Sequence, residues 1–143
     1  MKVFAERLIA AVRQRQNPVL VGLDPRWENL PAGLRVGERR DYAAVADAYR
    51  RFCCGVIDAV AALVPIVKPQ AAFFEEIGPP GMAALADVIR HAREHGLLVI
   101  VDGKRNDIGS TATAYAGGTI VSAFTSHLRS TSPLKASRSV PPL

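Results

Sequence analysis

The chain has 143 residues and a mass of 15.3 kDa, enough for one ordinary domain. Its composition, with 49% hydrophobic and 22% charged residues, excludes a disordered chain, and no apolar run reaches the roughly 20 residues that a membrane span needs. The net charge is +5, but basic and aromatic residues are not interleaved, so we expect neither nucleic acid nor a membrane as a partner.

The two cysteines, Cys53 and Cys54, are adjacent in the sequence. Neighbours on a helix point in different directions, so this pair does not form an ordinary disulfide, and no CxxC pair is present to hold a metal. We expect two small, largely buried side chains in a protein from a reducing compartment. The sequence therefore predicts a soluble, cytoplasmic protein.

The first third of the chain predicts a helix, a strand and a long loop. Apolar side chains recur at helical spacing over residues 3–15, and Asn17-Pro18 ends that helix. The apolar run 18–24 follows and closes on Asp24, which predicts a buried strand. Residues 25–40 contain two prolines and two glycines and predict a loop, in which Trp27 is interpreted as a local packing anchor.

The middle of the chain alternates between helix and strand. Asp41 is the expected N-cap of a long helix that runs to about Leu63. A strand (65–70), a turn (78–81), a helix (82–96) closed by Gly96 and a strand (97–102) follow in that order. This alternation predicts an α/β fold with a parallel sheet and helical crossovers.

A charged residue lies at or near the end of each predicted strand: Asp24, Lys68 and Asp102. In α/β folds the carboxyl ends of parallel strands form the active face, so we expect these side chains to meet. The motif Asp102-x-Lys104-x-x-Asp107 strengthens this expectation, because residues two apart on an extended segment point the same way. A lysine between two carboxylates keeps the acids ionised and is itself held protonated, as a general acid requires.

The composition changes after residue 116. Residues 117–143 contain six serines, three threonines and three prolines but no acidic residue. Apart from a possible strand at 119–124, this tail has no helical or strand periodicity and predicts an irregular, disordered end. We expect a domain over residues 1–116 followed by a basic tail that results from a frameshift or a miscalled end.

Three segments together resemble a known enzyme family. VGLDP (21–25), VKPQAAFFE (67–75) and VDGKRNDIGSTATAYA (101–116) are similar to the motifs of orotidine 5′-phosphate decarboxylase, in particular its bacterial type 2 subfamily. The resemblance implies a carboxy-lyase that converts orotidine 5′-phosphate to uridine 5′-phosphate and carbon dioxide. This reaction is the last step of de novo pyrimidine nucleotide synthesis and uses no metal or organic cofactor.

The resemblance also implies a role for each matching residue. Lys104 resembles the proton donor to C6 of the pyrimidine, and Asp102 resembles the carboxylate placed against the substrate's carboxyl group. Lys68 resembles the lysine that contacts ribose and orients that carboxylate, and Asp24 resembles the acid that binds a ribose hydroxyl. Three further residues resemble those that reach into the partner's site across a homodimer interface, namely Asp107, Ile108 and Thr111.

The fold of this family is a TIM (β/α)8 barrel of eight strands and about 250 residues. The chain supplies three or four βα units, so we expect the N-terminal portion of such a barrel. The phosphate site of these barrels typically lies in the loops after strands 7 and 8, and no phosphate-binding loop motif replaces it here. We therefore expect this chain, taken alone, to show no more than a trace of decarboxylation.

The sequence also fits two other functions. Related phosphate-binding barrels act as metal-dependent lyases on sugar phosphates and need an extra acid near the second strand, where Glu75 and Glu76 lie. A non-catalytic fragment that associates with a partner subunit is the other alternative. His91 and His95 are four residues apart on a predicted helix, but without a third ligand we interpret them as a solvated helix face and expect no metal site.

Overall fold

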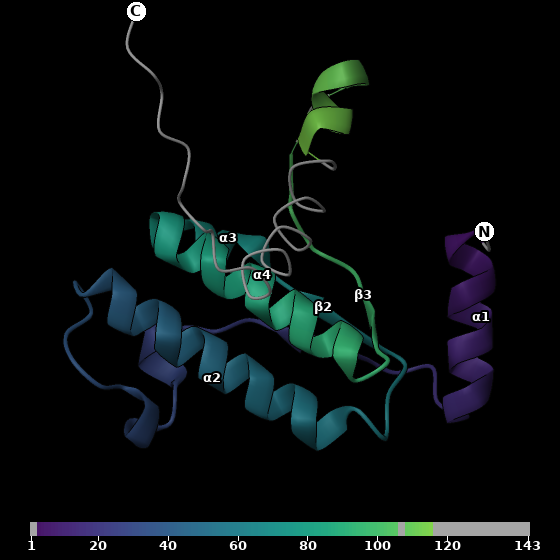
Figure 1. The fold of residues 1–143 in the computed structure, drawn as a ribbon, viewed down its shortest axis with the longest axis horizontal. Helices are drawn as coiled ribbons and strands as arrows, with labels where there is room; N and C mark the ends of the chain where they lie inside the picture. Colours follow the sequence, from purple (N-terminus) through teal and green to yellow (C-terminus); the bar gives the residue numbers. More distant parts are fainter. Residues whose placement is uncertain (1–2, 106–107, 116–143) are drawn as a thin grey trace, which may run out of the picture.

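The computed structural model describes residues 3–105 and 108–115 (Figure 1). Its elements in chain order are α1 (Phe4–Arg15), β1 (Leu20–Leu23), α2 (Tyr42–Val60), β2 (Ile66–Pro69), α3 (Ala71–Glu75), α4 (Gly78–Glu94) and β3 (Leu98–Val99). Two short 3-10 turns lie between β1 and α2, and a last helix spans residues 109–115. The predicted alternation of helix and strand is confirmed, whereas the predicted tail and its possible strand at 119–124 lie outside the described residues.

The three strands form one parallel sheet in the order β1-β2-β3. Gly22 pairs with Lys68, and Val67 pairs with Val99. Backbone hydrogen bonding between the second and third strands continues past β3, because the amide of Asp102 donates to the carbonyl of Pro69 at 3.0 Å. The sheet therefore aligns the carboxyl ends of all three strands, as the sequence predicts.

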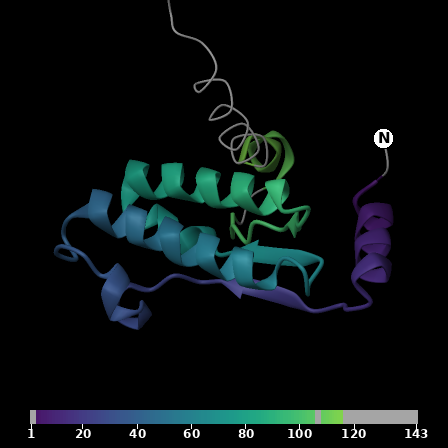
Figure 2. The ribbon, with the colours of Figure 1, turned by 60° about the horizontal axis from the view of Figure 1, so that its bottom comes forward.

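The two faces of this sheet differ in what covers them. Helices α2 and α4 lie against one face only (Figure 2), where the buried side chains of Leu23 and Val67 join the core. Successive strand residues point to opposite faces, so Gly22 and Lys68 belong to the other face. The alternation of side chains along each strand thus places the hydrophobic core on one face of the sheet and the polar side chains of the strand ends on the other face.

The core fills the space between the sheet and the helices. Tyr49 of α2 meets Phe74 of α3 edge to face, with ring centroids 6.1 Å apart, and both side chains are fully buried. Cys53 belongs to the same buried cluster, and burial raises the pKa of its thiol to about 12, so it behaves as a small hydrophobic residue. Cys54 is half-buried and Trp27 packs against the core, which confirms the packing role predicted for that tryptophan.

Most helix boundaries follow their sequence signals. Asp41 caps α2 as predicted, because its Oδ1 accepts from the amides of Ala43 and Ala44 at 3.1 Å each. Gly96 takes a positive φ of 73° after α4. The segment 78–81, predicted as a turn before the helix, instead forms its first turn, because proline is compatible with the first helical positions, where the amide has no partner within the helix.

The first helix stands apart from this unit (Figure 1), and none of its residues is buried. Its connection to the body is polar: Asn17 Nδ2 donates to the carbonyl of Leu63 at 2.9 Å. Residues 25–40, predicted as a loop, carry the two 3-10 turns (Trp27–Asn29 and Ala32–Leu34). Within the described part of the chain, no helix is long and apolar enough to cross a membrane.

Candidate active site

Three polar side chains gather at the carboxyl ends of β2 and β3. Lys68 lies in β2, Gln70 follows it two residues later, and Asp102 lies opposite Gln70 in a parallel bridge. Because Lys68 and Gln70 are two residues apart on an extended segment, both side chains project from the same face. The sheet register therefore places two hydrogen-bond donors, the ammonium group of Lys68 and the amide of Gln70, beside the carboxylate of Asp102.

Asp102 is the centre of this cluster. Its Oδ2 accepts from Lys68 Nζ at 3.1 Å and from Gln70 Nε2 at 3.2 Å. Its Oδ1 accepts from Lys104 Nζ at 2.6 Å. One carboxylate thus lies between two ammonium groups, with 24% of its own side chain exposed.

The two lysines determine the charge of the cluster. The hydrogen bonds from Lys104, first, and Lys68, second, lower the pKa of Asp102 to about 2. The carboxylate is therefore ionised throughout the physiological range. Lys104 is the most exposed member, with 78% of its side chain open to solvent, so its ammonium group is free to face a bound molecule.

We expect the titration of Asp102 to report both lysine contacts. Followed by the carboxyl-carbon NMR shift, the pKa should be about 2 and should rise towards its ordinary value of 3.8 in Lys104→Met, and by a smaller amount in Lys68→Met. The pKa of Asp102 is lower in the folded chain than in the unfolded chain. The stabilisation from this carboxylate is therefore complete above about pH 4 and is lost as the pH falls through about 2. An unchanged pKa in Lys104→Met would contradict the ion pair.

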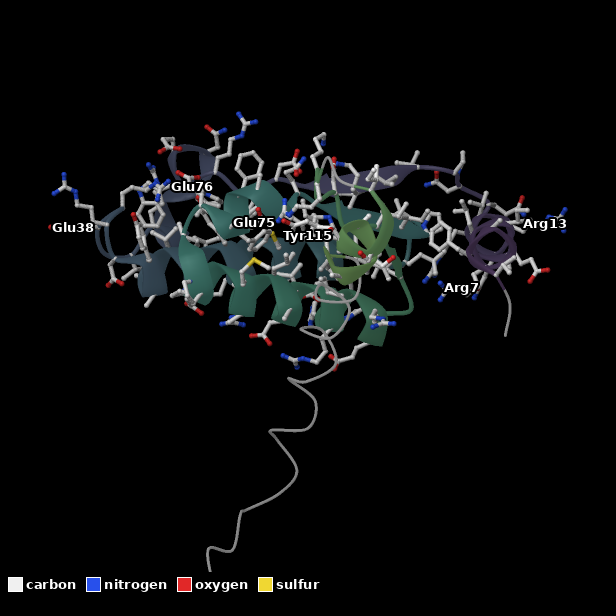
Figure 3. All side chains as sticks on the ribbon, turned by 90° about the horizontal axis from the view of Figure 1, so that it is seen from above. Arg7, Arg13, Glu38, Glu75, Glu76 and Tyr115 are labelled. Atoms are coloured by element: carbon white, nitrogen blue, oxygen red, sulfur yellow. The ribbon has the colours of Figure 1, made fainter. Side chains whose placement is uncertain are left out.

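Arg105→Ala is the matched control for this titration. Arg105 is adjacent to Lys104, but its guanidinium group pairs with the Glu75 carboxylate of α3 and lies 5.4 Å from the Tyr115 ring centroid. Figure 3 shows Glu75 and Tyr115 on the same part of the molecule. The Arg105→Ala variant removes a neighbouring positive charge without removing a donor to Asp102, so it should leave the pKa of Asp102 near 2.

The remaining predicted site residues lie outside this cluster. Asp24 follows β1 and is exposed, and among the described residues no hydrogen bond or ion pair joins it to Lys68 or Asp102. Ile108, with 86% exposure, and Thr111, also exposed, lie in the segment that leads away from the sheet (Figure 1). Asp107 lies outside the residues that the structure describes.

The two acids considered for a metal-dependent site are engaged elsewhere. Glu75 pairs with Arg105, and Glu76 Oε1 accepts from Arg39 Nη2 at 2.6 Å. Neither carboxylate contacts Asp102 among the described residues. Among the described residues, the structure therefore assembles a cluster of two lysines, one carboxylate and one amide at the ends of β2 and β3.

Sequence reasoning missed Gln70 and Arg105 as members of this region. The signal for Gln70 was present, since it lies two residues after Lys68 on a predicted strand. Arg105 carried no such signal, because its partner Glu75 is 30 residues away on a helix of only five residues that periodicity does not detect.

A protein-family model matches most of the chain. Residues 17–136 match the family model described as "Orotidine 5'-phosphate decarboxylase / HUMPS family". The match includes Asp24 and the whole Lys68–Asp102–Lys104 cluster. It therefore agrees with the resemblance that the three sequence motifs carry.

Individual relatives agree with this match. An orotidine 5′-phosphate decarboxylase of Rhodopirellula baltica is 59% identical over 125 residues, covering 86% of this chain and 41% of the relative. One of Deinococcus radiodurans is 43% identical over 115 residues, covering 80% and 38%. A crystal structure of a candidate orotidine 5′-phosphate decarboxylase from Streptomyces avermitilis superposes with a TM-score of 0.65 at 36% identity, covering 82% and 39%. The chain thus spans about two fifths of these relatives' length.

Proposed function

Because the chain belongs to the orotidine 5′-phosphate decarboxylase / HUMPS family, we propose that it carries the decarboxylation centre of an enzyme that converts orotidine 5′-phosphate to uridine 5′-phosphate. Its three strands and their helices correspond to the N-terminal part of the barrel of the solved relatives. The observation that carries the proposal is the ionised Asp102 between Lys68 and Lys104.

The proposed chemistry follows from the charges of this cluster. The bond between C6 and the carboxylate carbon breaks, carbon dioxide leaves, and the electron pair stays on C6. The Lys104 ammonium group stabilises that developing negative charge and then transfers a proton to C6. Asp102 holds the ammonium group of Lys104 in place through the 2.6 Å contact, and Lys68 in turn holds Asp102 through the 3.1 Å contact, so little reorganisation is needed as the charge develops.

The proposal extends to the residues beyond the cluster. Asp24 and Lys68 are proposed to bind the ribose hydroxyls, because both lie at the same edge of the sheet. Asp107, Ile108 and Thr111 are proposed to act across a homodimer interface, which fits the exposure of Ile108 and Thr111. The reaction is proposed to use no cofactor and to take place in the cytoplasm, where the two free cysteines stay reduced.

A hybrid enzyme tests this function. Residues 17–115 of this chain replace the matching segment of the Rhodopirellula baltica relative, so that the rest of the barrel is supplied. We expect the hybrid to decarboxylate orotidine 5′-phosphate with a kcat within about tenfold of that of the Rhodopirellula baltica enzyme. The cluster supplies the reacting groups, and only the residues that pack around them differ. Loss of orotidine 5′-phosphate absorbance measures the rate without an added metal.

Two outcomes would overturn this proposal. A hybrid that folds, as judged by circular dichroism, but has no decarboxylase activity would show that the segment lacks a working centre. Activity that appears only with added Mg²⁺, and on a sugar phosphate, would favour the metal-dependent alternative. Among the described residues no contact supports that alternative, since Glu75 and Glu76 are paired with arginines.

A further inference from the structure

Two histidines and one aspartate meet on the outer surface of the two long helices. Asp58 belongs to α2, while His91 lies in the last turn of α4 and His95 caps its end. His91 Nε2 is 2.6 Å and His95 Nε2 is 3.4 Å from Asp58 Oδ1. One ligand atom from each of the three side chains lies within 4.8 Å of the others, so the atoms surround a common point.

A metal ion bound here replaces the proton between His91 Nε2 and Asp58 Oδ1, which lie 2.6 Å apart, because a metal binds a deprotonated imidazole nitrogen. His95 Nδ1 lies 2.9 Å from the carbonyl oxygen of His91, and because a carbonyl only accepts, this nitrogen carries the proton. In the neutral ring this places the lone pair on His95 Nε2, the atom that lies 3.4 Å from Asp58 Oδ1. A backbone hydrogen bond of this kind fixes the ring orientation of many metal-binding histidines.

We propose that Asp58, His91 and His95 form a binding site for a divalent transition-metal ion, with Zn²⁺ as the expected occupant. Imidazole nitrogen and carboxylate oxygen are ligands that Zn²⁺ prefers, whereas Mg²⁺ and Ca²⁺ favour oxygen ligands alone. The fourth position is left to water, because all three side chains are partly exposed, between 28% and 56%.

The position of this site separates it from the proposed decarboxylation centre. His95 lies three residues before β3 begins, while Asp102 follows three residues after that strand ends. Because α2 and α4 run back along the parallel sheet, the two clusters occupy opposite ends of the strands. A bound ion therefore joins α2 to α4 and takes no part in the chemistry at Lys104.

The sequence alone predicted no metal site at these two histidines. The spacing of His91 and His95 alone indicated two ligands on one helix face, which is too few for a stable site. Asp58 supplies the third, and it is 33 residues before His91 in the sequence. Only the packing of α2 against α4 brings the three side chains together.

Calorimetric titration of the 143-residue chain with ZnCl2 tests the proposal. We expect one ion per chain, and a roughly 10–100-fold loss of affinity in each of His91→Ala, His95→Ala and Asp58→Ala. His127→Ala is the matched control, since it removes the third histidine of the sequence and keeps Asp58, His91 and His95, and it should bind Zn²⁺ as the parent does. A Co²⁺ titration should give the visible absorption bands of a site with nitrogen and oxygen ligands.

Each alternative has its own outcome in this experiment. Absence of Zn²⁺ binding in the folded parent would overturn the proposal and leave an ordinary hydrogen bond between Asp58 and His91. Binding lost in His127→Ala or in Cys54→Ser, but kept in His91→Ala and His95→Ala, would also overturn it by placing the ion elsewhere. Circular dichroism of each variant shows that a loss of binding is not a loss of fold.

Discussion

Replacing Lys104 with alanine in the hybrid enzyme should lower kcat by about 10³-fold or more. The variant removes both the ammonium group that stabilises the carbanion and the proton that C6 receives. It also leaves Asp102 with Lys68 and Gln70 as its donors. Steady-state decarboxylation of orotidine 5′-phosphate measures the effect, and the larger part should fall on kcat because the charge develops only in the transition state.

Two further variants separate charge from proton transfer. Lys104→Arg keeps a positive charge beside Asp102 but holds its proton too tightly to donate it, so it should remain at least about 10²-fold below the parent. Arg51→Ala removes a positive charge from an exposed position on α2 and should leave kcat unchanged. Retention of activity within about tenfold in Lys104→Ala would contradict the role proposed for this lysine.

A second large effect is expected at Gly81, in the first turn of α4. A Cβ atom at this buried position would lie 2.5 Å from Ile77 Cγ1 and even closer to the carbonyl oxygen of Phe74, a backbone atom that cannot move away. Gly81→Ala should therefore lower the free energy of unfolding by about 3 kcal/mol or more, because α4 must shift away from α3. Urea denaturation of the 143-residue chain, followed by circular dichroism, measures this change.

Gly55→Ala provides the comparison for that experiment. Gly55 lies in the middle of α2, and beyond the backbone of its own helix and its two chain neighbours no atom is within 4 Å of the Cβ position. Alanine there should raise the free energy of unfolding by about 0.5–1 kcal/mol, because glycine loses more conformational freedom in a helix. Equal stability of the two alanine variants would show that Gly81 is not the point where α3 and α4 are in closest contact.

The parts of the site that the sequence predicted are those governed by local periodicity. Lys68 and Asp102 each end an apolar strand, and parallel strands bring their carboxyl ends together, so the meeting of these two side chains follows from the pattern. Lys104 follows Asp102 by two residues and shares its direction. The hydrogen bond that caps α2 at Asp41 was predictable for the same reason, since it joins residues close in sequence.

The parts that the sequence did not predict depend on tertiary packing. The short helix α3 has five residues, too few for a periodic signal, and its Glu75 meets Arg105 across 30 positions. The Pro79-Pro80 pair suggested a turn, yet the chain uses both prolines inside the first turn of α4. Asp58 and His91 meet because two helices pack, which no spacing within either helix indicates.

The alternation of faces in β2 also has a consequence for insertions and deletions. Removing a single residue from Ile66–Pro69 would exchange the two faces, placing the Lys68 side chain under the helices and Val67 at the site. The exposed stretch 35–38, between the second 3-10 turn and α2, has no such constraint, because doubling the length of a flexible loop costs only about 0.6 kcal/mol. Changes in chain length are therefore confined by geometry to the connections, and the number of residues in each strand is itself a requirement for function.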